Sequence, residues 1–274
     1  MKDAGTRYEF FLGGNDLEME TIRHLLSSQA GVVVHDKRLA WGAAASDYTN
    51  EIESALAAGH VPVLVELPDD TGAVPRGARA IDHHGASSDR PSALRQVFDL
   101  LGLPKTRWTR WFELVAANDQ AYLNGLRAIG ASLDEMRQVR SEDRQAQGVT
   151  PQDEAEGELA VAAATHPAPG VTVVRIPHGR TAVVTDRLHE AFGGHGYHVL
   201  VVFSPSEVNV FAPARIVRHL VDRYPGTPAE AWSGGSTEGE GFWGRRNVPD
   251  NFLDQLLALA GETPGSRPAL AAGR

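Results

Sequence analysis

Cysteine is missing from all 274 residues of the chain. Its absence excludes disulfide bonds, thiolate nucleophiles and zinc sites that depend on sulfur ligands. Long apolar runs are missing too, because none approaches the ~18–20 residues that span a bilayer. The first residues, MKDAGTRYEFF, lack the apolar core of a signal peptide. We therefore expect a cytoplasmic protein that makes no use of a membrane.

An excess of positive charge is also lacking. The chain has 26 Lys and Arg residues against 35 Asp and Glu residues, which gives a formal net charge of −9. Long double-stranded nucleic acid requires a broad basic face, so it is excluded as the expected partner. A small phosphorylated substrate in one pocket is compatible with this charge, and clustered carboxylates attract divalent cations. Formation of a homodimer stays open.

The rest of the composition is that of an ordinary globular protein, with 42% hydrophobic and 22% charged residues. In the first half, short apolar runs such as 32–34 alternate with amphipathic stretches such as 16–29. This alternation predicts a parallel sheet with helices on both faces. In the second half, β-branched runs at 171–177, 180–186 and 197–204 predict further strands.

We predict an α/β protein with two domains. A parallel-sheet domain is expected at 1–136, and a second, smaller α/β domain that binds substrate at 171–262. Residues 137–170 combine a charged stretch with the sequence THPAPG, which is typical of a connecting helix and linker. Residues 263–274 have a turn-forming composition, which predicts a mobile tail.

Acidic and imidazole side chains follow the predicted strands of the first half. In a parallel sheet, ligands bind beyond the carboxyl ends of the strands. Seven such side chains fall at these ends or in the helices nearby: Asp16, Glu18, Glu66, Asp82, His83, His84 and Asp119. Carboxylates held close together repel one another, so their convergence calls for a cation. Oxygen and imidazole ligands in this mixture suit Mn²⁺, Mg²⁺ or Zn²⁺.

Each of these residues also has a structural explanation. Asp16 and Glu18 are acids in the first turn of a predicted helix, where the helix dipole favours them. A single Asp-His-His triplet, as at 82–84, arises by chance in many proteins. It is the whole set, ordered along an alternating α/β pattern, that favours a shared site.

Two short motifs give the chain a family resemblance. With IDHHG at 81–85 and NDLEM at 15–19, it resembles the DHH phosphoesterase superfamily, strongly around 60–125 and moderately around 8–50. Its second half is similar to the substrate-binding domain associated with that superfamily. The resemblance implies a metal-dependent phosphoesterase that hydrolyses a short oligonucleotide, a dinucleotide or another small phosphoester in a cleft between two domains. It favours Mn²⁺ over Mg²⁺ or Zn²⁺, as one or two ions.

The resemblance also assigns roles to individual residues. Metal binding falls to six side chains: Asp16, Glu18, Glu66, Asp82, His83 and Asp119. His84 becomes the contact to the substrate or transition state, and Asp82 joins it as a catalytic residue. In the second half, the stretch 232–244 matches the expected glycine-rich loop in its place after a strand and a helix. Gly234 and Gly235 would let backbone amides approach a phosphate, and Arg245 and Arg246 would pair with its oxygens.

The chain departs from the family pattern where a metal ligand is expected. Leu12 stands where the family places a histidine, and Glu18 and Glu66 replace aspartates. One metal position is therefore expected to be weak, rearranged or empty. His35 is a candidate replacement imidazole, the alternative being a surface histidine before a turn. Two other functions stay open: a catalytically weak relative that binds nucleotide or phosphate as a regulator, and a structural role in which the triplet is coincidental.

Overall fold

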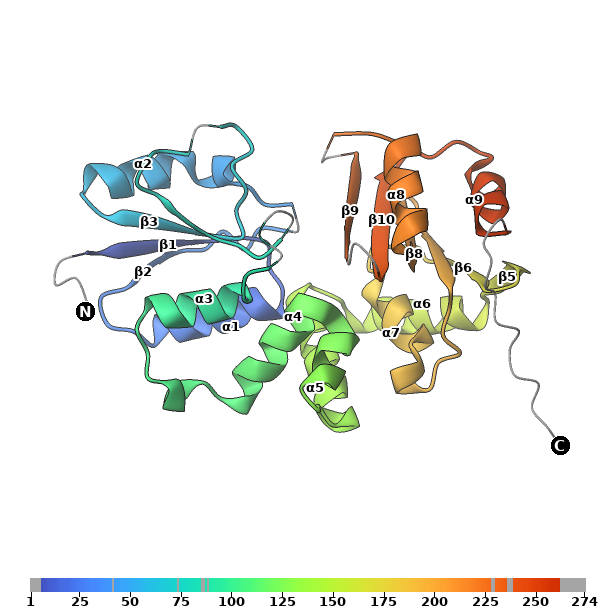
Figure 1. Cartoon of the computed structure of the whole chain (residues 1–274), viewed down its shortest axis with the longest axis horizontal. Helices are drawn as coiled ribbons and strands as arrows, with labels where there is room; N and C mark the ends of the chain where they lie inside the picture. Colours follow the sequence, from blue (N-terminus) through green and yellow to red (C-terminus); the bar gives the residue numbers. More distant parts are fainter. Residues whose placement is uncertain are drawn as a thin grey trace. The chain divides into compact units, whose positions relative to one another are not determined.

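The computed structural model describes residues 6–40, 42–72, 74–84, 87, 89–227, 230–235 and 239–261. The chain divides into two compact units, Met1–Gly148 and Val149–Arg274. Each unit contains its own sheet with helices packed against it (Figure 1). The protein is therefore a two-domain α/β protein, which confirms the predicted fold class.

The sheet of the first unit has four parallel strands in the order β2-β1-β3-β4. They are β1 (Tyr8–Leu12), β2 (Val33–His35), β3 (Val61–Val65) and β4 (Arg79–Ile81). Phe10 of the inner strand β1 pairs with Val34 on one side and with Val63 on the other. Because all four strands run the same way, their carboxyl ends meet at one edge of the sheet.

Helices cover both faces of this sheet, as the alternation in the sequence predicts. The helices of this unit are α1 (Leu17–Ser27), α2 (Thr49–Ala57), α3 (Ala93–Leu100), α4 (Arg110–Ala128) and α5 (Leu133–Ala146), with short 3₁₀ turns η1 (Ala45–Tyr48) and η3 (Lys105–Arg107). Figure 1 shows α2 on one face and α1 with α3 on the other.

Period-two alternation in β1 explains why both faces are apolar. Phe11 packs with Tyr48 and Ile52 in the cluster beneath α2. Phe10 and Leu12 point to the opposite face and are fully buried. Burial of each such side chain contributes about 1.5–3 kcal/mol, so apolar packing stabilises both faces of the sheet.

The second unit has a six-stranded mixed sheet in the order β5-β6-β7-β8-β10-β9. Its strands are β5 (Thr165–Ala168), β6 (Val171–Arg175), β7 (Val199–Phe203), β8 (Glu207–Pro213), β9 (Ala231–Gly235) and β10 (Glu240–Arg246). Its helices are α6 (Pro151–Ala162), α7 (Ala182–Leu188), α8 (Ala214–Arg223) and α9 (Phe252–Gly261), with a 3₁₀ turn η4 (Glu190–Phe192). Strands β6 and β7 are parallel, and the other pairs are antiparallel.

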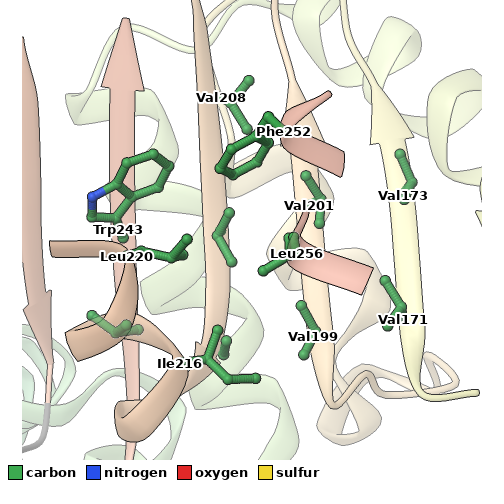
Figure 2. Packing of buried hydrophobic residues seen from close by; sticks show 13 residues of the cluster. Val171, Val173, Val199, Val201, Val208, Ile216, Leu220, Trp243, Phe252 and Leu256 are labelled. Carbon is green, nitrogen blue, oxygen red and sulfur yellow. The ribbon is translucent and has the colours of Figure 1, made fainter. Parts of the chain in front are cut away.

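Helices α8 and α9 pack on one face of this second sheet. Figure 2 shows valines of β6, β7 and β8 meeting Leu220 of α8 and Leu256 of α9. Trp243 of β10 is buried there and stacks on Phe252, with ring centroids 5.6 Å apart. Trp243 is thus a core residue of the second unit.

The predicted strand at 180–186 is wrong, because the segment forms helix α7. Its β-branched residues misled the prediction: Val183 and Val184 pack in a second apolar cluster of this unit instead of pairing in the sheet. Gly157 of α6 makes this packing tight, since a Cβ there would lie 2.4 Å from Val183 Cγ2. Tertiary packing therefore overrides the local strand preference.

Residues 137–170, where a connecting helix and linker are expected, contain the end of α5, all of α6 and strand β5. Helix α5 continues to Ala146 within the first unit, and α6 begins at Pro151 in the second. Gly148 lies in the short connection between these helices, and its φ of 79° is one that glycine adopts readily. The expected tail at 263–274 lies outside the described residues. None of the helices in the described part of the chain has the length and apolar character needed to cross a membrane.

Candidate metal centre

Three segments that follow strands, together with helix α4, deliver the predicted side chains to one edge of the first sheet. Glu18 lies in the first turn of α1, just after β1. Glu66 follows β3, and His83 lies two residues beyond the end of β4. Asp119 comes from the interior of α4. The shared parallel direction of the strands is what brings residues so distant in sequence together.

These four residues converge on one point. Each offers one ligand atom, and the four atoms all lie within 4.8 Å of one another. His83 Nε2 lies 2.5 Å from Asp119 Oδ2, 3.1 Å from Glu66 Oε1 and 3.8 Å from Glu18 Oε2. The side chain of Glu18 is 0% exposed and that of His83 only 6%. The cluster is therefore a compact, desolvated group of three carboxylates and one imidazole.

The converging atoms are in close contact with one another but do not form regular hydrogen bonds. Glu18 Oε2, Glu66 Oε1, His83 Nε2 and Asp119 Oδ2 are all buried, and none makes a hydrogen bond of normal geometry within the described residues. Buried polar atoms are almost always satisfied, and leaving one unpaired costs about 1–3 kcal/mol. Four such atoms aimed at one another are the arrangement that a cation satisfies, so the donor set fits a divalent metal ion.

The electrostatics of the cluster point the same way. Burial raises the pKa of Glu18 well above its usual value, and the charges of Asp119 and Glu66 raise this pKa further. Burial alone would lower the pKa of His83, but the carboxylates of Asp119 and Glu66 outweigh it and raise that pKa to about 10. The site thus holds a surplus of negative charge and favours any positive charge that enters it.

Glu18 is fixed in place by the start of helix α3. The Leu94 amide donates to Glu18 Oε1 over 3.0 Å. Ser92 caps the same helix by accepting a hydrogen bond from the Arg95 amide. An anionic oxygen at a helix N-terminus is stabilised by the free amides and by the helix dipole. One oxygen of Glu18 is therefore anchored, which leaves Oε2 to face the cluster.

Glu66 has a strained backbone. Its φ of 52° lies in the left-handed region, which residues other than glycine seldom adopt. Its amide donates to the Ile81 carbonyl over 2.8 Å, which ties the end of β3 to the end of β4. Gly13 permits the close approach of β1, because a Cβ there would lie 2.6 Å from the Glu66 carbonyl oxygen. Strain of this kind persists where the surroundings over-determine the conformation, as at functional sites.

His84 and Asp82 form a pair at the exposed side of the cluster. Asp82 Oδ1 accepts a hydrogen bond from the His84 amide at 2.9 Å and lies 3.0 Å from His84 Nδ1. Burial alone would raise the pKa of Asp82, but the bonds from His84 outweigh it and lower that pKa. The bond to Asp82 in turn raises the pKa of His84. The His84 side chain is 61% exposed, and its ring centroid lies 4.3 Å from that of His83.

Asp16 lies beside the cluster without joining the four converging atoms. Its Oδ1 accepts from the Met19 amide at 2.8 Å, so Asp16 is the N-cap of α1. Desolvation raises its pKa well above the usual value, and the charges of Asp119, Glu66 and Asp143 add to this effect. The charges of the cluster therefore act on Asp16, while one of its oxygens caps helix α1.

No family model matches the chain, and no curated protein sequence matches it. Among solved structures, the pGpG-specific phosphodiesterase PggH from Vibrio cholerae is similar in fold at a TM-score of 0.46. The two sequences are 13% identical over 93% of this chain and 98% of that chain. The likeness is distant, and the chemistry of the site rests on its own geometry.

The family resemblance places a histidine at position 12, where this chain has a buried leucine. Leu12 at the end of β1 is fully buried among apolar residues. His35 does not belong to the four-residue cluster, because its Nε2 lies 2.7 Å from Glu9 Oε2 and its ring stacks on Phe11 at 4.4 Å. Within the described residues, two groups of possible metal ligands lie at this edge. One consists of Glu18, Glu66, His83 and Asp119, and the other of Glu66, His83 and His84.

Three residues that support the cluster were not predicted from the sequence: Asn118, Arg140 and Asp143. All three are buried and hydrogen-bonded to one another through Arg140. Arg140 and Asp143 lie three residues apart in the charged stretch that predicts a connecting helix. Their spacing is the one sequence signal that indicates a pair on a helix face.

The residues expected to bind substrate in the second unit have structural partners. Gly234 of β9 pairs with Phe242 of β10, and a Cβ there would lie 2.7 Å from the Phe242 ring. Gly235 has a φ of 99°. Arg245 Nη1 donates to the carbonyls of Tyr224 and Pro225. Arg246 is exposed at the end of β10. Substrate binding by these four residues stays a prediction.

Proposed function

We propose that the protein is a metal-dependent phosphoesterase that hydrolyses a small phosphorylated substrate. The observation that carries this proposal is the convergence of four buried ligand atoms, none of them in a regular hydrogen bond, beside the exposed imidazole of His84. A short oligonucleotide, a dinucleotide or another small phosphoester is the substrate class. The net charge of −9 favours a small substrate over a long strand.

The metal site of this proposal is held by Glu18, Glu66, His83 and Asp119. Three carboxylates and one imidazole suit Mn²⁺ best, with Mg²⁺ and Zn²⁺ as alternatives. A bound divalent cation supplies positive charge that polarises a phosphoryl oxygen and makes a water molecule more acidic. Because Leu12 leaves no imidazole on β1, we propose one ion per chain at this cluster.

The exposed pair of His84 and Asp82 then acts on the substrate. Asp82 Oδ1 lies 3.0 Å from His84 Nδ1, which fixes the orientation of the ring and favours its charged form. An oriented, exposed imidazole that carries a proton can donate to a phosphoryl oxygen and stabilise the charge that develops on it. In the second unit, Arg245 and Arg246 with Gly234 and Gly235 are proposed to contribute to substrate binding.

The test is turnover by the purified protein. With Mn²⁺ present, short oligonucleotides, linear dinucleotides and simple phosphomonoesters are incubated with the protein, and the products are separated by ion-exchange chromatography. We expect hydrolysis of at least one class, and a loss of at least roughly 100-fold in His83→Asn and His84→Asn. His195→Gln is the matched control, since His195 is an exposed histidine of the second unit. Elemental analysis is expected to find one Mn²⁺ per chain.

A regulatory protein is the second candidate, and Leu12 is the observation that favours it. A site with fewer ligands can bind a cation and a phosphate without turning the phosphate over. Tight binding of Mn²⁺ together with no hydrolysis of any substrate class would favour this alternative. Absence of Mn²⁺ binding would count against both candidates.

A further inference from the structure

Arg140 and Asp143 form a buried ion pair on helix α5. Both residues are 5% exposed, and Arg140 Nη1 donates to Asp143 Oδ2 over 2.7 Å. A buried pair is costly to desolvate, and removing either partner leaves an uncompensated charge. The further contacts of this pair lie beside the candidate metal site.

One set of contacts reaches the start of α1. Asp143 Oδ1 accepts a hydrogen bond from the Leu17 amide at 3.2 Å. Leu17 lies between Asp16 and Glu18, and its amide is one of the first-turn donors that a helix cannot satisfy by itself. Asp143 thus adds a second cap to α1, from another helix. This cap fixes the turn that carries the Glu18 carboxylate.

A second set of contacts reaches the middle of α4. Arg140 Nη1 donates to Asn118 Oδ1 over 3.0 Å, and its guanidinium lies 4.5 Å from the centre of the Tyr122 ring. Asn118 and Tyr122 flank Asp119 in the sequence. Helix α4 is interrupted here, because Ala121 and Tyr122 have non-helical backbone angles and the φ of Tyr122 is 51°. Arg140 therefore holds both sides of the segment that carries the Asp119 carboxylate.

We infer that Arg140 and Asp143 are positioning residues that set the distance between the carboxylates of Glu18 and Asp119. This inference rests on the proposed function, since it takes the cluster to be a cation site. Neither residue belongs to the converging group, and each holds a neighbour of a ligand. The two ligands come from different helices, α1 and α4, so a common anchor on α5 fixes their spacing. Groups that orient metal ligands change metal affinity by roughly 10–100-fold when they are mutated.

A second ion pair between α4 and α5 provides the matched control. Arg110 begins α4, and its Nε lies 2.9 Å from Glu135 Oε1 of α5. This pair also joins the two helices, but Arg110 lies nine residues before Asp119, and its hydrogen bonds go to Glu113, Glu135 and the Ile129 carbonyl instead of to the segment 118–122. Loss of helix docking alone would therefore appear in an Arg110 variant as well as in an Arg140 variant.

The experiment measures Mn²⁺ affinity by isothermal titration calorimetry on the full chain, with metal-free thermal unfolding recorded for each variant. Arg140→Gln is expected to weaken Mn²⁺ binding by roughly 10–100-fold, whereas Arg110→Gln is expected to leave it within about twofold. Arg140→Lys keeps the charge and a donor on the same side, so it is expected to recover most of the affinity. Asp143→Asn keeps an acceptor for the Leu17 amide, loses the one for Arg140, and is expected to weaken binding as well.

Each outcome has a distinct meaning. A folded Arg140→Gln or Asp143→Asn protein with wild-type Mn²⁺ affinity would overturn the positioning role. The same holds if Arg110→Gln weakens binding as much as Arg140→Gln does. If Arg140→Gln does not fold, Asp143→Asn and Arg140→Lys decide the matter by the same comparison. Wild-type protein that binds no Mn²⁺ would instead overturn the proposed function.

Discussion

Glu18 uses its two carboxylate oxygens for two different purposes. Oε1 accepts from the Leu94 amide, and Oε2 lies in the cluster without a hydrogen bond. The fold therefore requires Glu18 to accept a hydrogen bond, whereas the proposed metal site requires it to carry a negative charge. These two demands can be separated by a single substitution.

Glu18→Gln is expected to keep the protein folded and to remove most of its response to Mn²⁺. The amide oxygen still accepts from Leu94, while the repulsion from Asp119 and Glu66 that raises the pKa of Glu18 is lost. Without metal, the variant should unfold at the wild-type temperature or above it. At Mn²⁺ equal to 100 times the Kd, wild type should gain about 2.7 kcal/mol and the variant much less. Calorimetry with and without Mn²⁺ measures both effects, and a metal-free variant that is clearly less stable would contradict this account.

Gly13 is the residue on which the close approach of β1 and β3 depends. An added Cβ would meet the Glu66 carbonyl oxygen at 2.6 Å, and backbone atoms cannot move aside cheaply. Gly13→Ala is expected to lower the free energy of unfolding by about 1–3 kcal/mol and to weaken Mn²⁺ binding by displacing Glu66. Gly179→Ala is the control, because the nearest atom there is Glu207 Oε1 at 3.5 Å. Urea unfolding compares the two, and equal effects would refute the steric argument.

At the scale of elements, Glu9 connects three neighbouring segments of the first sheet. From β1 it contacts His35 at the end of β2 and His60, which directly precedes β3. Burial alone would raise the pKa of Glu9, but the hydrogen bonds with His60 and His35 outweigh it and lower that pKa below its usual 4.5. A lowered pKa in the folded state means that the ionised carboxylate stabilises the fold.

The stabilisation by Glu9 has a defined pH dependence. It is fully present above the ordinary carboxyl value of 4.5 and is lost as the pH falls through the lower value of the folded state. Glu9→Gln is expected to be less stable than wild type by about 1–2 kcal/mol at pH 7. Denaturant unfolding between pH 7 and about pH 3 should show this difference shrinking in acid. A difference that stays constant over that range would rule out the ionised carboxylate as its source.

Sequence patterns predicted the elements with a clear period and a clear order. The parallel sheet follows from the alternation of short apolar runs and amphipathic helices, and it explains why Glu18, Glu66 and His83 share an edge. The segment 180–186 was mispredicted because a short β-branched run does not distinguish a strand from a buried helix. Here the packing of Val183 against Gly157 decides for the helix.

The support of the cluster was beyond sequence reasoning for a different reason. Asp143 and the Leu17 amide are 126 residues apart, and Arg140 and Asn118 are 22 residues apart. Neither pairing leaves a periodic signal, and a charged helix such as α5 is more often solvated than buried. The prediction therefore found the acids that converge and missed the ion pair that anchors them.

At the scale of the whole molecule, the candidate metal centre lies within the first unit. The converging residues, Arg140 and Asp143 all lie before the boundary at Gly148. Residues 1–148, produced alone, are expected to fold and to bind Mn²⁺ within about threefold of the full chain, because domains with their own core fold independently. Phosphoester hydrolysis by this fragment should be much weaker. Circular dichroism and calorimetry test the first expectation, and full hydrolytic activity of the fragment would contradict the proposed contribution of the second unit.

The order in which the chain is made gives helix α5 one more consequence. Domains fold from the N-terminus onwards while the ribosome adds about 5–20 residues per second. Until Arg140 and Asp143 have left the ribosome, the Leu17 amide and Asn118 lack the partners that hold them in the finished protein. If the cluster binds a cation as proposed, its full affinity therefore requires α5 to have emerged, at a time when most of the second unit is still untranslated.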